Sequence, residues 1–178
     1  MTDPPISGWF SELVDSEIDS LHRHVRLVYP FASTEQTVHE TFRRAAHGAA
    51  SSTAPTVRSW LRRLARTAVL SGASDAEGWQ RRNASLIQLE FRDSAEGIDD
   101  PEVQRIALDL AARFENLSGG TLELLRMLAI EALDLDEVAH VLDVAPDTAQ
   151  ELVENARVAL RRLGQVSNGE STTEEGVW

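Results

Sequence analysis

The spacing of apolar residues constrains this chain most, because nearly every periodic stretch follows the helical repeat and almost none alternates as a strand does. Near the N-terminus, five apolar residues fall on one helical stripe, separated in turn by four, three, four and three positions: Val14, Ile18, Leu21, Val25 and Val28. Pro30 predicts the end of that helix. The sequence therefore predicts an all-α protein.

The same reading divides the chain into two small helical domains. The first is expected over residues 8–72, with a helix from about Thr34 to His47 that stops at Gly48. Residues 73–99 lose the periodic pattern and are interpreted as a linker, in part helical. The second domain is expected over residues 100–164, where Ser118-Gly119-Gly120 is interpreted as a helix stop. Residues 165–178 are polar and acidic, and we expect a disordered tail.

Composition narrows the class of protein. The chain has 178 residues, of which 42% are apolar and 26% charged, and it has no cysteine, so no disulfide is possible. No stretch approaches the roughly 20 apolar residues of a transmembrane helix, and the first residues do not resemble a secretory signal. We therefore expect a cytoplasmic protein that does not insert into membranes.

Catalytic and metal-binding patterns are missing from the sequence. It has no glycine-rich phosphate loop, nucleophile elbow or zincin motif. His22 and His24 are two positions apart, so on a helix they point to different sides and form a poor metal-ligand pair. The sequence predicts no enzyme, no metal site and no cofactor.

Charge is distributed unevenly along the chain. The net charge is −12, yet residues 21–70 carry a net +6, whereas residues 121–160 carry a net −7. Four arginines fall largely opposite the apolar side of one predicted helix and are candidate DNA-binding residues: Arg58, Arg62, Arg63 and Arg66. We also expect the acidic C-terminal helices to dock against this arginine face in the free protein, which would make the protein its own inhibitor.

The C-terminal part contains a candidate helix-turn-helix. A short helix over residues 134–142 is followed by the turn Asp143-Val144-Ala145, and Pro146 opens a longer helix. The small Ala139 would let the two helices cross closely, and Val144 would fill the turn. From spacing alone, an ordinary αα-hairpin fits these residues equally well.

A resemblance separates these two readings. Residues 131–149 and 156–163 resemble the promoter −35 reader of extracytoplasmic-function (ECF) sigma factors of the sigma-70 family. Residues 34–43 are similar to the clamp-binding helix of that family, and residues 57–66 to the helix that follows it. The resemblance implies a region 2-like domain and a region 4-like domain in a transcription initiation factor.

The resemblance also implies two interfaces. One polar face would meet the β′ clamp of the RNA polymerase core or another protein partner: Glu35, Gln36, His39, Glu40 and Arg43. The recognition helix would present six polar residues to DNA: Asp147, Thr148, Gln150, Glu151, Glu154 and Asn155. Typical members carry basic residues in this helix and a basic run after the position of Arg66. Here both places are neutral or acidic, which is unfavourable for phosphate contacts.

Three functions follow from these observations. The favoured one is a sigma-like transcription regulator that acts mainly through contacts with the RNA polymerase core or an anti-sigma factor. Its C-terminal domain would have weakened or lost DNA readout, and the chain on its own would bind promoter DNA only weakly. One alternative is a functional ECF sigma factor that directs the polymerase to specific promoters. The other alternative is a helical scaffold protein unrelated to transcription.

Overall fold

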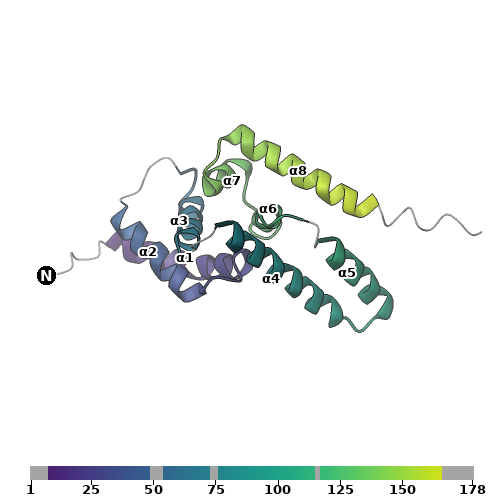
Figure 1. The fold of residues 1–178 in the computed structure, drawn as a ribbon. Coiled ribbons are helices and arrows are strands. Elements are labelled where there is room, and N and C mark those ends of the chain that lie inside the picture. Colours follow the sequence, from purple (N-terminus) through teal and green to yellow (C-terminus); the bar gives the residue numbers. More distant parts are fainter. Residues whose placement is uncertain (1–7, 49–53, 73–75, 115–116, 166–178) are drawn as a thin grey trace, which may run out of the picture.

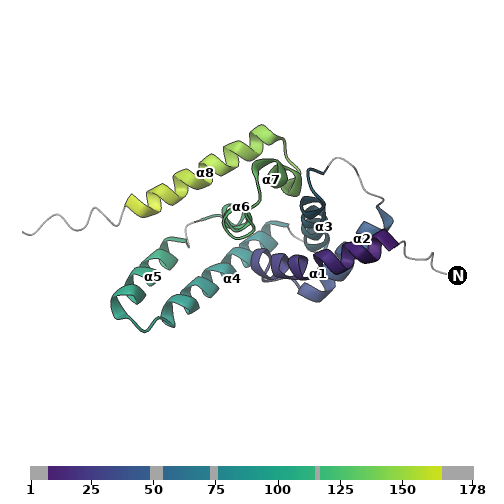
Figure 2. The ribbon, with the colours of Figure 1, turned by 180° about the vertical axis from the view of Figure 1, so that it is seen from behind.

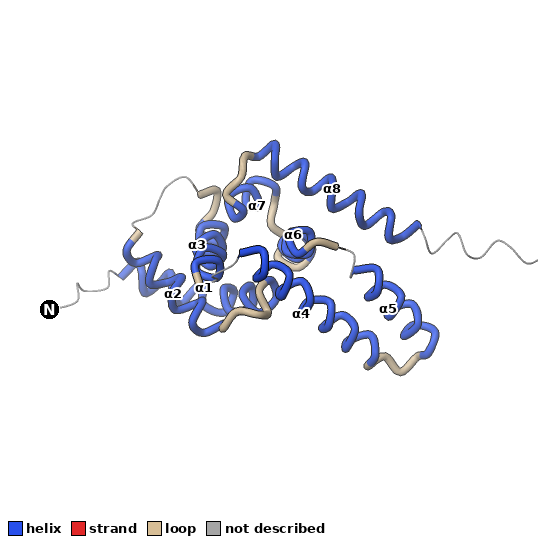
Figure 3. The backbone as a smooth tube through the Cα atoms, in the orientation of Figure 1, coloured by secondary structure: helices blue, strands red, loops and turns tan. Residues whose placement is uncertain are grey.

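The computed structural model describes residues 8–48, 54–72, 76–114 and 117–165, and all the regular elements in these ranges are α-helices (Figures 1 and 3). Their order is α1 (Gly8–Val28), α2 (Thr34–His47), α3 (Val57–Ser71), α4 (Ala76–Glu96), α5 (Pro101–Phe114), α6 (Gly119–Ala129), α7 (Leu135–Leu142) and α8 (Pro146–Gln165). The all-α prediction is confirmed. Of the expected tail, all residues after Gln165 lie outside the described ranges.

Helices α1, α2 and α3 pack around a core of their own. Its buried members are Leu21, Val25, Val38, Phe42, Ala45, Leu61 and Ala65. The local sequence sets the helix ends: α1 ends two residues before Pro30, α2 ends at Gly48, and Thr56 caps the start of α3 by accepting a hydrogen bond from the Ser59 amide. The predicted helix from Thr34 to His47 is confirmed residue for residue.

A second core lies mainly between α6, α7 and α8. Its buried members from these helices and the adjoining turns are Leu124, Met127, Leu133, Val138, Ala139, Val141, Ala149, Val153 and Ala156. The N-terminal half adds Val28, Tyr29 and Val69 to this core. The two halves are therefore packed on each other, with α3 against α7 and α1 against α6.

The segment interpreted as a linker consists mostly of a helix, α4, which runs for 21 residues. It forms a hairpin with α5, and this hairpin extends away from α1, α2 and α3 (Figures 1 and 2). Because α4 contacts both α5 and α6, its apolar residues are not confined to one stripe, which explains the weak helical pattern. The hairpin leaves Leu89, Val103 and Ile106 about half exposed.

Helix α6 begins where a helix stop was expected. The side chain of Ser118 accepts a hydrogen bond of 3.2 Å from the Thr121 amide, and this cap places Gly119 and Gly120 in the first turn of α6. The chain does break here between α5 and α6, but the two glycines lie after the break, because the Ser118 cap starts α6 at Gly119. Among the described helices, none combines the length and apolar character needed to span a membrane.

Candidate functional site

One face of α2 is polar and exposed. The helix itself lies at the edge of the three-helix group (Figure 1). Glu35, Gln36, His39 and Arg43 are exposed, and Glu40 is partly exposed. The opposite face buries Val38 and Phe42 in the N-terminal core. The structure thus brings together all five residues expected to contact a protein partner.

Glu40 organises the charge on this face. Its carboxylate accepts a hydrogen bond of 2.7 Å from Arg43 and another of 2.7 Å from Arg44. These arginines lie three and four positions further along the same helix. These hydrogen bonds lower the pKa of Glu40 from 4.5 to about 2. Glu40 is therefore ionised and paired with two guanidiniums at any physiological pH.

The four candidate DNA-binding arginines of α3 all contact carboxylates from the C-terminal half. Arg58 and Arg62 pair with Glu131 at 3.4 and 2.9 Å. Arg63 pairs with Asp143 at 2.6 Å and Arg66 pairs with Glu123 at 2.9 Å. We call this contact between α3 and residues 123–143 the arginine seam. The expected docking of the acidic C-terminal half on the arginine face is confirmed.

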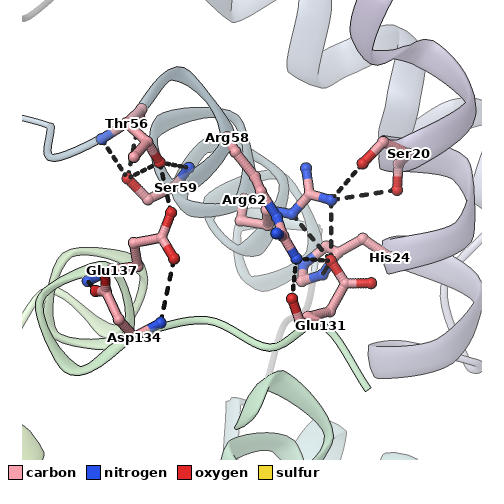
Figure 4. Close-up of polar contacts among 9 residues, drawn as sticks. All are labelled: Ser20, His24, Thr56, Arg58, Ser59, Arg62, Glu131, Asp134 and Glu137. Carbon is pink, nitrogen blue, oxygen red and sulfur yellow. Dashed lines mark hydrogen bonds and ion pairs between the residues drawn. The ribbon is translucent and has the colours of Figure 1, made fainter. Parts of the chain in front are cut away.

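Glu131 is the centre of the arginine seam (Figure 4). It lies in the turn after α6, and its side chain is 1% exposed. Arg62, which is fully buried, also donates a hydrogen bond of 2.8 Å to the Ser20 hydroxyl of α1. His24 places its Nδ1 3.6 Å from the Glu131 carboxylate. Arg62 is thus an interior residue that joins α1, α3 and the turn, rather than a surface residue.

The backbone that carries Glu131 is strained at the next residue. Ala132 has φ of 49°, in the left-handed region that non-glycine residues rarely adopt. The amide of Leu133 donates a hydrogen bond of 3.2 Å to the Met127 carbonyl, which closes the turn. This turn points Glu131 back towards α3 instead of continuing α6.

Burial sets the protonation states of this cluster. Burial lowers the pKa of His24 below 6.5; contact with Glu131 opposes this shift, and the Arg62 guanidinium adds to it. Burial alone would raise the pKa of Glu131, but its contacts with His24 and Arg62 outweigh burial and lower that pKa to about 2. At neutral pH the cluster therefore contains a neutral imidazole beside a carboxylate that the guanidiniums balance.

The candidate helix-turn-helix residues form a short helix, a turn and a long helix, α7 and α8, as predicted. Asp143 ends α7 with φ of 59°, and the Val144 amide donates a hydrogen bond of 3.1 Å to the Ala139 carbonyl. Ala139 is buried between the helices, and Val144 packs against the second core. The six polar residues expected on the recognition helix are all exposed: Asp147, Thr148, Gln150, Glu151, Glu154 and Asn155. Glu154 is paired with Arg157 at 2.6 Å on the same helix.

A hydrogen bond links the starts of α3 and α7 (Figure 4). The Thr56 hydroxyl, which caps α3, donates to the Glu137 carboxylate at 2.6 Å. Glu137 in turn accepts a hydrogen bond of 3.2 Å from the Asp134 amide, and Asp134 caps α7. Each helix therefore has a capping box, and the two boxes are joined.

Sequence reasoning found the arginines but not their partners. The sequence does not distinguish these partners, Glu123, Glu131 and Asp143, from the other acidic side chains between positions 121 and 160. One signal was present for Glu131, which lies between an apolar helix and a capped one. In the sequence, His24 was notable only as one of two histidines poorly spaced to bind a metal, yet the structure buries it completely.

Known proteins supply no assignment for these surfaces: the chain matches no family model, and no curated protein matches it.

Proposed function

We propose that this chain is a sigma-like transcription regulator that acts mainly through protein contacts, with the exposed face of α2 as the surface that binds the RNA polymerase core. The single observation that carries the proposal is the contrast between two polar helix faces. The α2 face is open, whereas the arginines of α3 are engaged within the molecule. Such a regulator would work in the cytoplasm.

The α8 surface also supports contacts with protein more than with DNA. Its exposed polar residues include three carboxylates, Asp147, Glu151 and Glu154, and the same helix provides Arg157 as an ion-pair partner for one of them. Carboxylates at a groove lined by phosphates are repelled and release no counterions. A region 4-like domain with this surface would bind duplex DNA weakly.

The direct test is capture of core RNA polymerase by the purified, tagged chain. The variant Gln36→Ala/His39→Ala/Arg43→Ala removes exposed side chains of the α2 face, so its fold should stay within about 1 kcal/mol of the wild type. We expect binding to fall about tenfold or more, which corresponds to about 1.4 kcal/mol. A matched variant on α8, Gln150→Ala/Asn155→Ala, should bind the polymerase as the wild type does.

Two outcomes separate the proposal from its alternatives. Glu151→Arg/Glu154→Arg restores basic residues on the recognition helix, and we expect no change in promoter response; a gained or altered response would favour a promoter-directing sigma factor. If the chain captures a small helical anti-sigma protein and no polymerase, the partner is the anti-sigma factor. If it captures neither, the scaffold reading replaces this proposal.

A further inference from the structure

The arginine seam joins two parts that each have a core of their own. All buried members of the first core come from α1, α2 and α3, so this group does not need the C-terminal half to bury it. The buried members of the second core include three residues of the N-terminal half, Val28, Tyr29 and Val69, and the partly buried Ala32 and Leu70 pack against it. Separation along the seam would expose these five residues and leave most of both cores intact.

The contacts across the seam are largely ionic. Glu131 and Glu123 have side chains that are 1% and 3% exposed, whereas the Arg63–Asp143 pair lies at the surface, with Asp143 71% exposed. Buried ion pairs contribute little net stability over solvated charges, because both partners lose water when they pair. A contact of this kind can therefore separate with a smaller change in free energy than an apolar interface of the same size.

Several buried polar atoms at or beside the seam form no hydrogen bond with the described residues. Nε2 of His24 and Nη1 of Arg62 are two of these atoms, and Nδ1 of His24 has only its 3.6 Å contact with the Glu131 carboxylate. Opening would let water reach these atoms, which favours the separated state relative to a fully satisfied interface.

We propose that the arginine seam is an autoinhibitory latch: residues 123–143 cover the arginines of α3 in the closed protein, and opening uncovers those arginines for single-stranded DNA. The proposal rests on the proposed function, because a regulator bound to the polymerase core through α2 would lie next to the melted promoter strands that the uncovered arginines would hold. Glu131 is the main closing contact, since it engages two of the four arginines.

Single-stranded DNA is the partner that fits the uncovered face. The four arginines form one stripe of α3, within a segment whose net charge is +6. A stripe of guanidiniums follows a phosphate backbone, and the closing carboxylates occupy the positions that phosphates would take. The closed protein should therefore bind single-stranded DNA weakly, because only the open fraction of molecules contributes to the apparent affinity.

The conformational test uses the absence of cysteine from the sequence. Ala46→Cys on α2 and Arg161→Cys on α8 place two labels at exposed positions in opposite halves. Spin labels at these positions report the distance between the halves by pulsed electron resonance. Binding is measured separately, at constant salt, with fluorescein-labelled oligothymidylate.

Two variants open the latch, and one serves as a matched control. Glu131→Gln removes the central charge. Asp143→Asn removes the exposed closing charge and retains a residue that tolerates the left-handed conformation, so it keeps the fold if Glu131→Gln does not. Glu17→Gln makes the same change in net charge on α1, beside Arg58 but within the N-terminal half.

We expect both opening variants to shift the label distances to longer values and to tighten oligothymidylate binding, by about tenfold for Glu131→Gln. Glu17→Gln should change neither quantity more than slightly. Unchanged distances in both opening variants, with helix content retained by circular dichroism, would overturn the latch. Longer distances without tighter binding would overturn its DNA role.

Failure of the latch and failure of the proposed function give different results. The label distances need no polymerase, so a latch that opens while polymerase capture fails would leave the conformational device in place and remove the function assigned to it. Conversely, if the chain captures the polymerase through α2 but the seam never opens, the proposed function stands and the latch is overturned.

Discussion

Tyr29 and Glu123 lie 94 positions apart in the chain, yet the tyrosine hydroxyl donates a hydrogen bond of 3.0 Å to Oε1 of the glutamate. The same oxygen accepts a hydrogen bond of 2.9 Å from Nε of Arg66. One buried carboxylate oxygen therefore ties together the residue after α1, the middle of α3 and the first half of α6. This contact is a second centre of the arginine seam, separate from Glu131.

The hydroxyl of Tyr29 should contribute measurably to stability. Tyr29→Phe keeps the ring, which is fully buried, and removes a hydrogen bond to a charged acceptor. We expect the free energy of unfolding to fall by about 1.5–3 kcal/mol. Urea denaturation followed by circular dichroism measures this loss; a change below about 0.5 kcal/mol would contradict the buried hydrogen bond.

Tyr29 should also report alkaline unfolding, because it is the single tyrosine of the chain. Burial and the neighbouring Glu123 charge raise the pKa of its phenol well above 10. A group with a raised pKa in the folded state contributes stability below pH 10, and this contribution is lost as the pH rises above that value. We expect the ultraviolet absorbance of tyrosinate to appear together with the loss of helix; ionisation before unfolding would refute this.

Arg62 should be among the most sensitive positions in the protein. Arg62→Met retains much of the volume but leaves the buried Glu131 carboxylate with the more distant Arg58 as its remaining arginine partner. Breaking a buried ion pair from one side costs about 3–5 kcal/mol. As a comparison, Arg157→Met removes an exposed pair on α8 and should cost less than about 1 kcal/mol in the same denaturation experiment.

Stability should fall in acid in two stages. The pKa of His24 is lowered by burial, so the unfolded chain binds a proton more tightly, and stability decreases as the pH falls below 6.5. The pKa of Glu131 is about 2 in the folded state, so its contribution is lost as the pH falls from 4.5 towards that value. Other charges that face His24 are those of Arg58 and Arg62, which both disfavour the imidazolium.

The variant His24→Phe isolates the first stage, because it retains the edge-to-face contact with the Tyr29 ring and cannot bind a proton. As the pH falls below 6.5, we expect the urea midpoint of wild-type protein to decrease and that of His24→Phe to stay nearly constant. His47→Gln changes an exposed histidine and should leave the profile of the wild type unchanged. Parallel profiles for His24→Phe and the wild type would contradict the role of His24.

Thr56 should matter through its hydroxyl alone. Thr56→Val keeps the shape but removes both the cap on the Ser59 amide and the hydrogen bond to Glu137, so we expect a loss of about 2–3 kcal/mol. Thr56→Ser retains the hydroxyl and should stay within about 1 kcal/mol of the wild type. Equal losses in the two variants would show that the methyl group, not the hydroxyl, is responsible.

The sequence sufficed for elements whose determinants are local. Helix α2 was predicted with its end at Gly48, and the turn after α7 was predicted from Ala139 and Val144. It did not suffice where a helix serves two partners, as α4 does, because packing on two sides removes the periodic signal. Nor did it show that Arg62 is interior: on a helical wheel it lies among the polar arginines, and only the approach of Glu131 from 69 positions away makes burial of its charge possible.

The joined capping boxes of α3 and α7 have a consequence for how the two halves can part. If the hydrogen bond between Thr56 and Glu137 breaks, Thr56 still caps the Ser59 amide, and Glu137 still accepts from the Asp134 amide. Neither helix loses its own N-terminal cap when its neighbour leaves. Separation of the two halves therefore need not unfold the starts of α3 and α7. The first turns of both helices should keep their protection from amide hydrogen exchange while the surfaces between them become exposed to solvent.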